Sequence, residues 1–340
     1  MFLGMLYLSA KGMWSAAGGP SMRFLIFGGG SIGSFFGAML SGAHEVVLVG
    51  RRDHVAAIGA AGLRMEGLDK GTFKITAVKD IDEAGGGAFD FILVTVKSPG
   101  TAEAAKTIST SKGLFGKGTT VVSVQNGLDN VRTLAQAFGD RVLVVLTSHG
   151  VLMEGPGTIV HTGKGDTVVG WPVTIGGKRK RSTREEGGRD AAVILTDALT
   201  KAGIESRLSE DMAREMWLKA AVNAGINPIC AIIGLENRYL LEVPALLNVW
   251  KAAVREVAAV ARSEGIEISD EEALKRTRTV AELTGDNKCS MLQDVERCRR
   301  TEVDSITGLV VRTGERNGVP VPVSATLLGL VKGIEKTYLR

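Results

Sequence analysis

A glycine-rich turn between a short apolar strand and a small-residue helix is the feature that most constrains this fold. The run Arg23–Phe27 leads into the turn, and a helical pattern follows it to Leu40. In such a turn the first glycine permits a tight bend, the second lets the backbone approach a pyrophosphate, and the third lets helix and strand pack closely. The phosphate then rests on the helix N-terminus. The turn predicts a dinucleotide site at Gly28, Gly29, Gly30, Ser31, Ile32 and Gly33.

Strands alternate with helices through the first part of the chain. Further apolar strand patterns lie at Glu45–Val49, Phe89–Val96, Thr119–Val124 and Arg141–Thr147. Helical patterns lie between them at Ala102–Ile108 and Asn130–Phe138. This alternation indicates parallel βαβ units, and continuous apolar strands are typical of a parallel sheet that is covered on both faces. Downstream we expect Thr158–His161 and Thr167–Gly170 to form a shorter antiparallel pair, followed by a helix at Asp190–Ala202 and a strand near Ile204–Leu208.

The strand signal stops after Ser209, and only helical patterns follow. They lie at Asp211–Ile233, Pro244–Glu264, Asp270–Thr284 and Met291–Asn317. The sequence therefore predicts an α/β N-terminal Rossmann-type domain over residues 22–208 and an all-α C-terminal domain over residues 209–340. Residues 1–21 are too short for a membrane span and lack the basic region of a signal peptide. We expect them to be an N-terminal extension outside the fold.

Charge and cysteine usage narrow the class of partner. The net charge of +4 suits acidic small molecules and is too weak to indicate nucleic acid. The loop 178–189 begins with a dense basic run that has no interleaved aromatic residues, so it is interpreted as a solvated surface loop. Three widely spaced cysteines and four histidines without ligand spacing favour free thiols in a reducing compartment and no metal site. We therefore expect a cytoplasmic protein that binds neither membrane nor nucleic acid.

The end of the second strand bears on the choice between NAD and NADP. An NAD site has an acidic residue about 20 residues after the glycine turn, where it binds the ribose 2′-hydroxyl. Here Val49-Gly50 is followed by Arg51 and Arg52. Because a guanidinium matches phosphate geometry, Arg51 favours the 2′-phosphate of NADP(H). Asp53 keeps NAD open, and the arginines could also be plain surface charges.

Lys97 and Asn126 each follow an apolar strand at its C-terminal end. Ligands of open α/β sheets bind outside those ends, so both side chains are expected to line a cofactor cleft. Taken singly, each residue is also an ordinary turn or cap residue, and Asn-Gly is a common turn.

Lys219, Asn223 and Asn227 share one face of a predicted helix, because residues four apart lie one above another. The surrounding segment is apolar or small, which is typical of a buried helix, and buried amides need hydrogen-bond partners. A lysine above two amides is suited to holding and protonating a small polar ligand. The alternative is a surface pair between Glu215 and Lys219, with the asparagines bonded to backbone elsewhere.

Ser290 begins a segment that has a complete local explanation. Ser290-Met-Leu-Gln293 is interpreted as a capping box, with serine at the N-cap and glutamine at N3. Glu302 follows on the same predicted helix. On spacing alone, neither Ser290 nor Glu302 is assigned to a site.

As an ordered set, these residues resemble the ketopantoate reductase family from about Met22 to the C-terminus. The lysine–asparagine helix and Ser290–Asp294 are the most specific part of the resemblance. The motifs are Gly28–Gly33, Arg51, Val96–Ser98, Gln125–Gly127, Ser148–Gly150, Lys219–Pro228, Ser290–Asp294 and Thr301–Asp304.

The resemblance implies an NADPH-dependent reduction of 2-dehydropantoate to (R)-pantoate, on the route to pantothenate and coenzyme A. It implies that Lys219 is the general acid and that Glu302 lies near the nicotinamide ribose and the reacting centre. The implied substrate residues are Asn223, Asn227, Ser290 and, on a looser match, Asn237. The implied cofactor contacts are Lys97, Asn126 and the backbone at Gly150. The chain departs from the family pattern at Cys289, in the basic loop and around Asn237.

Two other functions stay open at the level of sequence. One is a related NAD(P)-dependent dehydrogenase that acts on a different 2-keto or 3-hydroxy acid. The other is a dinucleotide-sensing protein that does not turn over a substrate, although such a protein has no need of the lysine and its two amides. The apolar helices after residue 209 are compatible with a homodimer as well as with a monomer.

Overall fold

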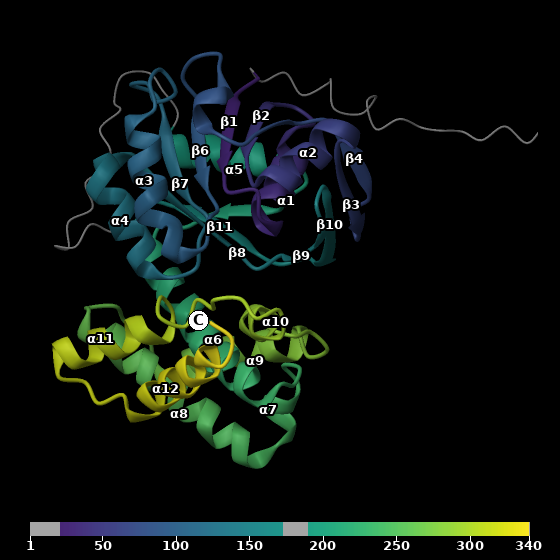
Figure 1. Cartoon of the computed structure of the whole chain (residues 1–340). Helices are drawn as coiled ribbons and strands as arrows, with labels where there is room; N and C mark the ends of the chain where they lie inside the picture. The colour runs from purple at the N-terminus through teal and green to yellow at the C-terminus, as the bar shows by residue number, and fades with distance from the viewer. Residues whose placement is uncertain (1–20, 173–189, 340) are drawn as a thin grey trace, which may run out of the picture.

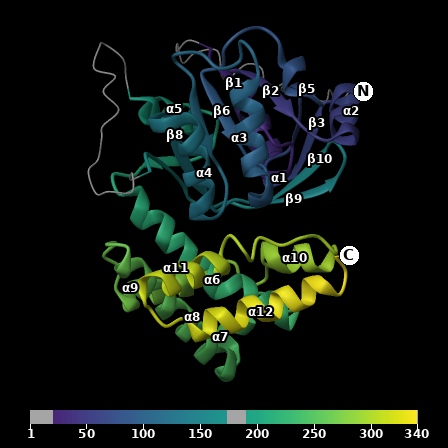
Figure 2. The ribbon, with the colours of Figure 1, turned by 60° about the vertical axis from the view of Figure 1, so that its left-hand side comes forward.

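The computed structural model describes residues 21–172 and 190–339. An α/β half and a helical half lie one above the other, joined by the long helix α6 (Figures 1 and 2). The expected α/β-plus-α fold is confirmed. The last strand ends at Leu208 and α6 begins at Met212, while the domain boundary at residue 209 stays a prediction. The expected basic loop and nearly all of the expected N-terminal extension lie outside the described residues.

An eight-stranded sheet forms the centre of the N-terminal half. Its order is β12-β11-β8-β7-β6-β1-β2-β5, in which the strands from β8 to β5 run parallel and β11 runs antiparallel to β8. The predicted strands at residues 23–27 and 45–49 are confirmed residue for residue. The bounds are β1 Arg23–Phe27, β2 Glu45–Val49, β5 Thr76–Val78, β6 Phe91–Val94, β7 Thr120–Ser123, β8 Val142–Thr147, β11 Thr167–Gly170 and β12 Ser206–Leu208.

Helices cover both faces of this sheet, as expected from its apolar strands. In β1, Phe24 and Ile26 pack in the cluster that contains α1 and α5, while Leu25 packs with α3 and α4 on the other face. This alternation follows from the two-residue period of a strand. The helix bounds are α1 Ser31–Leu40, α2 Arg52–Ala61, α3 Thr101–Thr110, α4 Leu128–Phe138 and α5 Ala191–Lys201.

A second, smaller sheet has the order β4-β3-β10-β9, with β3 Leu63–Gly67, β4 Gly71–Phe73, β9 Gly150–Gly155 and β10 Thr158–Gly163. The expected pairing of Thr158–His161 with Thr167–Gly170 is wrong. The first segment pairs with β9 and β3, and the second pairs with β8 in the main sheet. The short turn at Pro156-Gly157 explains the difference, because it favours a hairpin between β9 and β10.

The C-terminal half is built around α6 (Met212–Ile233). Gly225 lets α8 approach closely, since a Cβ there would lie 2.7 Å from a methyl carbon of Val254. Helix α6 is long and apolar enough to cross a membrane, but 67% of its most apolar window is buried inside the protein, as expected of a core helix. The other helices are α7 Tyr239–Glu242, α8 Pro244–Ser263, α9 Asp270–Leu283, α10 Ser290–Glu296, α11 Thr307–Asn317 and α12 Pro322–Lys336.

The single helix expected over Met291–Asn317 is wrong. Helix α10 ends at Glu296, and Cys298 adopts a positive φ of 51° that an α-helix does not permit. The N–H of Arg299 then donates to the carbonyl of Asp294 at 2.8 Å, which closes the turn. The chain from residue 297 to residue 306 is therefore free to fold back, and Glu302 lies in this irregular segment.

The expected capping box is also wrong in its register. Cys289 is the N-cap of α10, and its Sγ accepts a hydrogen bond from the N–H of Leu292 at 3.4 Å. Ser290 is the first helical residue, so its exposed hydroxyl is not used in capping. Gln293 donates instead to the carbonyl of Lys288 at 2.9 Å.

Candidate active site

The glycine turn has the geometry that a pyrophosphate site requires. Gly28 has a φ of +124°, which side-chain residues rarely adopt. A Cβ on Gly33 would lie 2.1 Å from the carbonyl oxygen of Gly28, so only glycine fits there. A Cβ on Gly30 would meet nothing within 4 Å, which leaves open space at the N-terminus of α1. The turn therefore fits a phosphate-bearing cofactor.

Arg51 stands at the tip of β2 as the N-cap of α2, and its side chain is exposed. Within residues 21–172 and 190–339 no ion pair or hydrogen bond engages its guanidinium. A surface arginine at the carboxyl edge of the sheet is available to an anionic group of a bound cofactor.

Glu302 crosses from the helical half to the carboxyl edge of the sheet. Its Oε1 accepts from both the N–H and the hydroxyl of Ser98, at 3.2 and 2.9 Å, and its Oε2 accepts from Nδ2 of Asn126 at 3.3 Å. Lys97 lies at the same edge and pairs with Asp294 of α10 at 2.5 Å. Lys97, Asn126 and Glu302 are thus brought together from three separate segments.

Lys219 reaches from α6 to the same region. Its Nζ donates to the carbonyl oxygen of Thr147, at the end of β8, at 2.5 Å. The surface pair between Glu215 and Lys219 does not form, because Glu215 pairs with Arg207 at 2.6 Å. Lys219 therefore forms no surface ion pair with Glu215 of its own helix.

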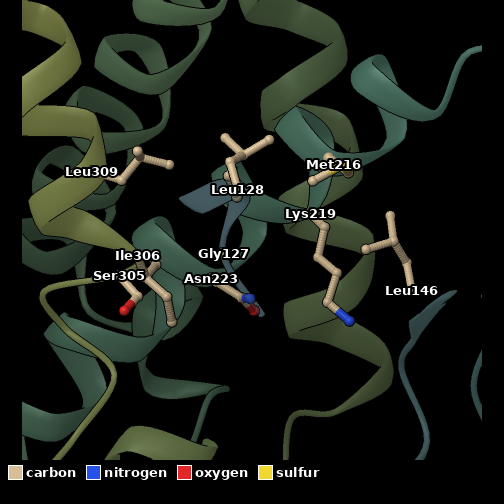
Figure 3. Close-up of a pocket in the computed structure, with 10 residues that line it drawn as sticks. Gly127, Leu128, Leu146, Met216, Lys219, Asn223, Ser305, Ile306 and Leu309 are labelled. Atoms are coloured by element: carbon tan, nitrogen blue, oxygen red, sulfur yellow. The ribbon is translucent and has the colours of Figure 1, made fainter. Parts of the chain in front are cut away.

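A pocket between the two halves is lined by Lys219 and Asn223 (Figure 3). The pocket has an empty volume of about 340 Å³, and part of this volume is open to solvent. The other lining residues come from α6 itself, from the loop after β7 and the start of α4, from β8 and from the region of α11, and are Gly127, Leu128, Leu146, Met216, Ala220, Ser305, Ile306 and Leu309. The walls are mainly apolar, which strengthens electrostatic interactions inside.

The environment of Lys219 lowers the pKa of its ammonium to about 8. Burial is the largest cause, because it disfavours the charged form. The carboxylate of Glu302 raises this pKa in part, and the guanidinium of Arg276 lowers it. An amine with a pKa near neutrality is suited to donating a proton during catalysis.

Asn223 and Asn227 carry side-chain amides that make no hydrogen bond to any described residue. Asn227 is only 6% exposed, so its free amide calls for a ligand or water. Cys289 donates through Sγ to the carbonyl of Asn227 at 3.6 Å, which brings the start of α10 against this part of α6. Ser290 directly follows Cys289 and so lies near Asn227, but neither Ser290 nor Asn227 lines the pocket of Lys219 and Asn223.

Asn237 and Gly150 occupy different surroundings. Asn237 is buried, and its Nδ2 donates to the carbonyl and hydroxyl oxygens of Thr284 at 3.2 and 2.9 Å, while its Oδ1 is buried without a partner among the described residues. Gly150 begins β9, where a Cβ would lie 2.8 Å from the hydroxyl oxygen of Thr162. Their assignments to substrate and cofactor stay predictions.

Three residues at the site were not assigned a role from the sequence. Thr147 offers a backbone carbonyl, which no side-chain pattern reveals. Ser98 and Asp294 contact Glu302 and Lys97 across the two halves of the chain. Ser98 directly follows Lys97 at a strand end, and both Ser98 and Asp294 lie in segments that carry the family resemblance.

Comparison with known proteins agrees with this geometry. The family model described as Ketopantoate reductase PanE/ApbA matches residues 24–172, and that described as Ketopantoate reductase PanE/ApbA C terminal matches residues 211–335. The 2-dehydropantoate 2-reductase of Pyrococcus abyssi is 35% identical over 316 residues, covering 92% of this chain and 98% of that protein. That of Bacillus subtilis is 29% identical over 317 residues, covering 93% and 98%.

Solved structures are similar over nearly the whole chain as well. The crystal structure of a PanE/ApbA family ketopantoate reductase from Ralstonia eutropha has a TM-score of 0.82 and 31% identity, and covers 94% of this chain and 100% of that one. The ternary structure of D-mandelate dehydrogenase with NADH and anilino(oxo)acetate has a TM-score of 0.82 and 26% identity, with coverage of 93% and 99%. With both halves matched by the family models and with relatives at this identity and coverage, the chain belongs to the ketopantoate reductase family.

Proposed function

We propose that this protein is a cytoplasmic NADP-dependent 2-dehydropantoate 2-reductase, which forms (R)-pantoate for pantothenate and coenzyme A biosynthesis. One observation carries the proposal. The ammonium of Lys219 and the unengaged amides of Asn223 and Asn227 lie on one face of α6, and Lys219 and Asn223 line the pocket between the two halves. A proton donor, two orienting amides and a hydride-carrier site are the groups that ketone reduction needs.

The cofactor in this proposal is a nicotinamide dinucleotide, in the form of NADP(H). The open space at Gly30 and the N-terminus of α1 would hold its pyrophosphate, and the free guanidinium of Arg51 would hold the 2′-phosphate. Lys97 and Asn126, together with the backbone at Gly150, are further proposed contacts.

The reaction needs a hydride, a proton and an oriented ketone. When bound, the reduced nicotinamide supplies the hydride for C2 of the substrate. Negative charge develops on the ketone oxygen, where the ammonium of Lys219 stabilises it and donates the proton. The carbonyl of Thr147 holds one N–H of the ammonium, which fixes the direction of the other two. Glu302 lies beside the reacting centre and keeps Lys219 charged.

Substrate orientation is assigned to Asn223, Asn227 and Ser290. Two free amides and an exposed hydroxyl offer both donors and acceptors to the carboxylate and the hydroxyl of the keto acid. Holding the ketone in one orientation lowers the entropic part of the barrier. Asn237 stays a secondary candidate because its donors are already used by Thr284.

The test is turnover of purified protein with a panel of 2-keto acids. We expect NADPH oxidation with 2-dehydropantoate to exceed that with 2-keto acids that lack its hydroxymethyl group, and to exceed oxidation of NADH. The likeness to D-mandelate dehydrogenase makes benzoylformate the sharpest comparison substrate. Faster reduction of benzoylformate would support the alternative of a related dehydrogenase, and dinucleotide binding without turnover would support a sensor.

The pH dependence of kcat is a second prediction. Only protonated Lys219 can act as the acid, so reduction should be fastest below its pKa of about 8 and should decline as the pH rises through that value. The measurement is kcat from pH 6 to 10 at saturating substrate, on the order of two units to either side of this pKa. A rate that rises through pH 8 would contradict the role of Lys219 as the acid.

A further inference from the structure

A chain of buried polar side chains leads from the interior of the N-terminal half to Glu302. Gln125, Thr101 and Asn130 are 6%, 2% and 3% exposed, so each must find its hydrogen-bond partners within the protein. They come from the loop after β7, the start of α3 and the first turn of α4. At the far end, the half-buried Ser98 meets Glu302 of the helical half.

Every hydrogen bond in this chain points the same way. Nε2 of Gln125 donates to the hydroxyl oxygen of Thr101 at 2.7 Å, and that hydroxyl donates to Oδ1 of Asn130 at 2.8 Å. Nδ2 of Asn130 donates to the hydroxyl oxygen of Ser98 at 2.9 Å, and Ser98 donates to Oε1 of Glu302 at 2.9 Å. Aligned hydrogen bonds polarise one another, so the last donor is strengthened.

The groups at the two ends of this series of hydrogen bonds fix the direction in which the bonds point. Gln125 must donate at its inner end, because its Nε2 also lies 2.8 Å from the carbonyl of Val96, which can only accept. A carboxylate at the outer end can likewise only accept. Between them, Nδ2 of Asn130 also donates to the carbonyl of Asn126 at 2.5 Å, so the amide is held in one orientation.

We propose that Thr101 and Asn130 are positioning residues of the reaction, which act through Ser98 to hold the carboxylate of Glu302 beside Lys219. The hydroxyl of Thr101 anchors Oδ1 of Asn130 and so keeps Nδ2 facing Ser98. Without that anchor one of the bonds that hold the amide is lost, and Nδ2, which still donates to the carbonyl of Asn126, can tilt away from Ser98. The Ser98 hydroxyl then loses the donor that orients it and can turn from Glu302 to the carbonyl of Asn126, which lies 3.2 Å from its oxygen. The proposal rests on the proposed function, since it assigns Lys219 as the acid.

The charged groups around Glu302 determine how this hydrogen-bonded relay, from Gln125 through Thr101, Asn130 and Ser98 to Glu302, affects the pKa of Lys219. Lys219 and Glu302 are held just beyond the ends of the neighbouring strands β8 and β7. The carboxylate of Glu302 raises the pKa of Lys219, and the guanidinium of Arg276 lowers it. Asp294 also faces Glu302 and is paired with Lys97. When Glu302 is less firmly held, the ammonium loses part of its favourable partner while Arg276 remains. The basic limb of the kcat profile should therefore move to lower pH.

The experiment compares Thr101→Val with Thr101→Ser, with Glu302→Gln as the reference for complete loss of the carboxylate. Valine keeps the shape of threonine and removes the hydroxyl, whereas serine keeps the hydroxyl. We expect Glu302→Gln to move the basic limb down by about one pH unit and Thr101→Val by about half of that. Thr101→Ser should match the wild type, and KM for the keto acid should not change in either Thr101 variant.

A second readout does not depend on turnover. Cyanate reacts with uncharged amines, so the pH dependence of carbamylation at Lys219, read by mass spectrometry, reports its ionisation directly. Thr101→Val should shift this curve downward and Thr101→Ser should not. If the carbamylation curves of Thr101→Val and Thr101→Ser were the same, whether both were shifted or neither, the proposed role of the Thr101 hydroxyl would be overturned. If the wild type reduces no keto acid, the proposed function fails, and the cyanate curves still decide the relay.

Ser98→Ala covers the case in which Thr101→Val does not fold. This variant removes the last hydroxyl donor at the half-buried end of the chain, and it should shift both curves in the same direction as Glu302→Gln. Unchanged curves in Ser98→Ala would overturn the proposal independently of Thr101.

Discussion

Replacing Lys219 with alanine is expected to lower kcat by about 10²- to 10⁴-fold, the usual contribution of a positioned general acid. The variant loses the only ammonium that faces the pocket lined by Asn223 among the described residues. Affinity for NADPH should hardly change, because Lys219 contacts neither the glycine turn nor Arg51. Steady-state kinetics for kcat and fluorescence titration of NADPH measure the two effects separately.

Lys219→Arg and Lys112→Ala sharpen this test. Arginine restores the positive charge but does not release its proton at accessible pH, so it should recover only the electrostatic part of the rate. Lys112 is exposed in the connection from α3 to β7, at the amino edge of the parallel sheet and away from the cleft. Its removal should leave kcat unchanged. Normal turnover by Lys219→Ala would sink the assignment.

Local patterns account for the parts of the fold that the sequence predicts well. The strands Arg23–Phe27 and Glu45–Val49 each consist of one charged residue and four apolar residues followed by a turn, so their limits can be read directly. The glycine turn is equally local, because the steric demands at Gly28 and Gly33 arise from the strand and helix beside them. The face shared by Lys219 and Asn223 follows from helix geometry alone.

Contacts between distant segments account for the errors. The helix expected over Met291–Asn317 has helical periodicity on both sides of Cys298, and only the positive φ at that residue shows that the chain turns. Cys289 replaces Ser290 as the N-cap because its thiol also meets the carbonyl of Asn227, on another helix. Glu302 therefore lies in a turn, where it can reach Ser98, some two hundred residues away in sequence.

In the candidate site, too, local patterns are predicted from the sequence, whereas contacts between distant segments are not. The sequence places Lys97 and Asn126 at strand ends, but it does not show that Glu302 meets one of them and Asp294 the other. Nor does it show that Lys219 donates to the carbonyl of Thr147, because a backbone carbonyl carries no residue signature. Spacing identifies which side chains share an element, and the packing of the two halves decides which elements meet.

Exchanging Arg51 for aspartate is expected to invert the cofactor preference. Loss of a charge-assisted hydrogen bond to phosphate costs about 1.5–3 kcal/mol, which is about 10- to 150-fold in the affinity for NADPH. Because Arg51 is exposed, screening by solvent and salt places the loss from Arg51→Ala near the lower end. Aspartate adds repulsion of the 2′-phosphate and offers an acceptor to the ribose 2′-hydroxyl of NADH.

The ratio of kcat/KM values for NADPH and NADH measures this preference, and the comparison of variants identifies its cause. Arg51→Ala should reduce the ratio mainly through KM for NADPH, and Arg51→Asp should reduce it further by lowering KM for NADH. Lys112→Ala removes one positive charge at the opposite edge of the sheet and should leave the ratio unchanged. Equal losses with both cofactors would show that Arg51 supports α2, where it is the N-cap, and does not recognise the phosphate. A wild-type preference for NADH would instead point to Asp53, in the first turn of the same helix, as the residue that binds the ribose.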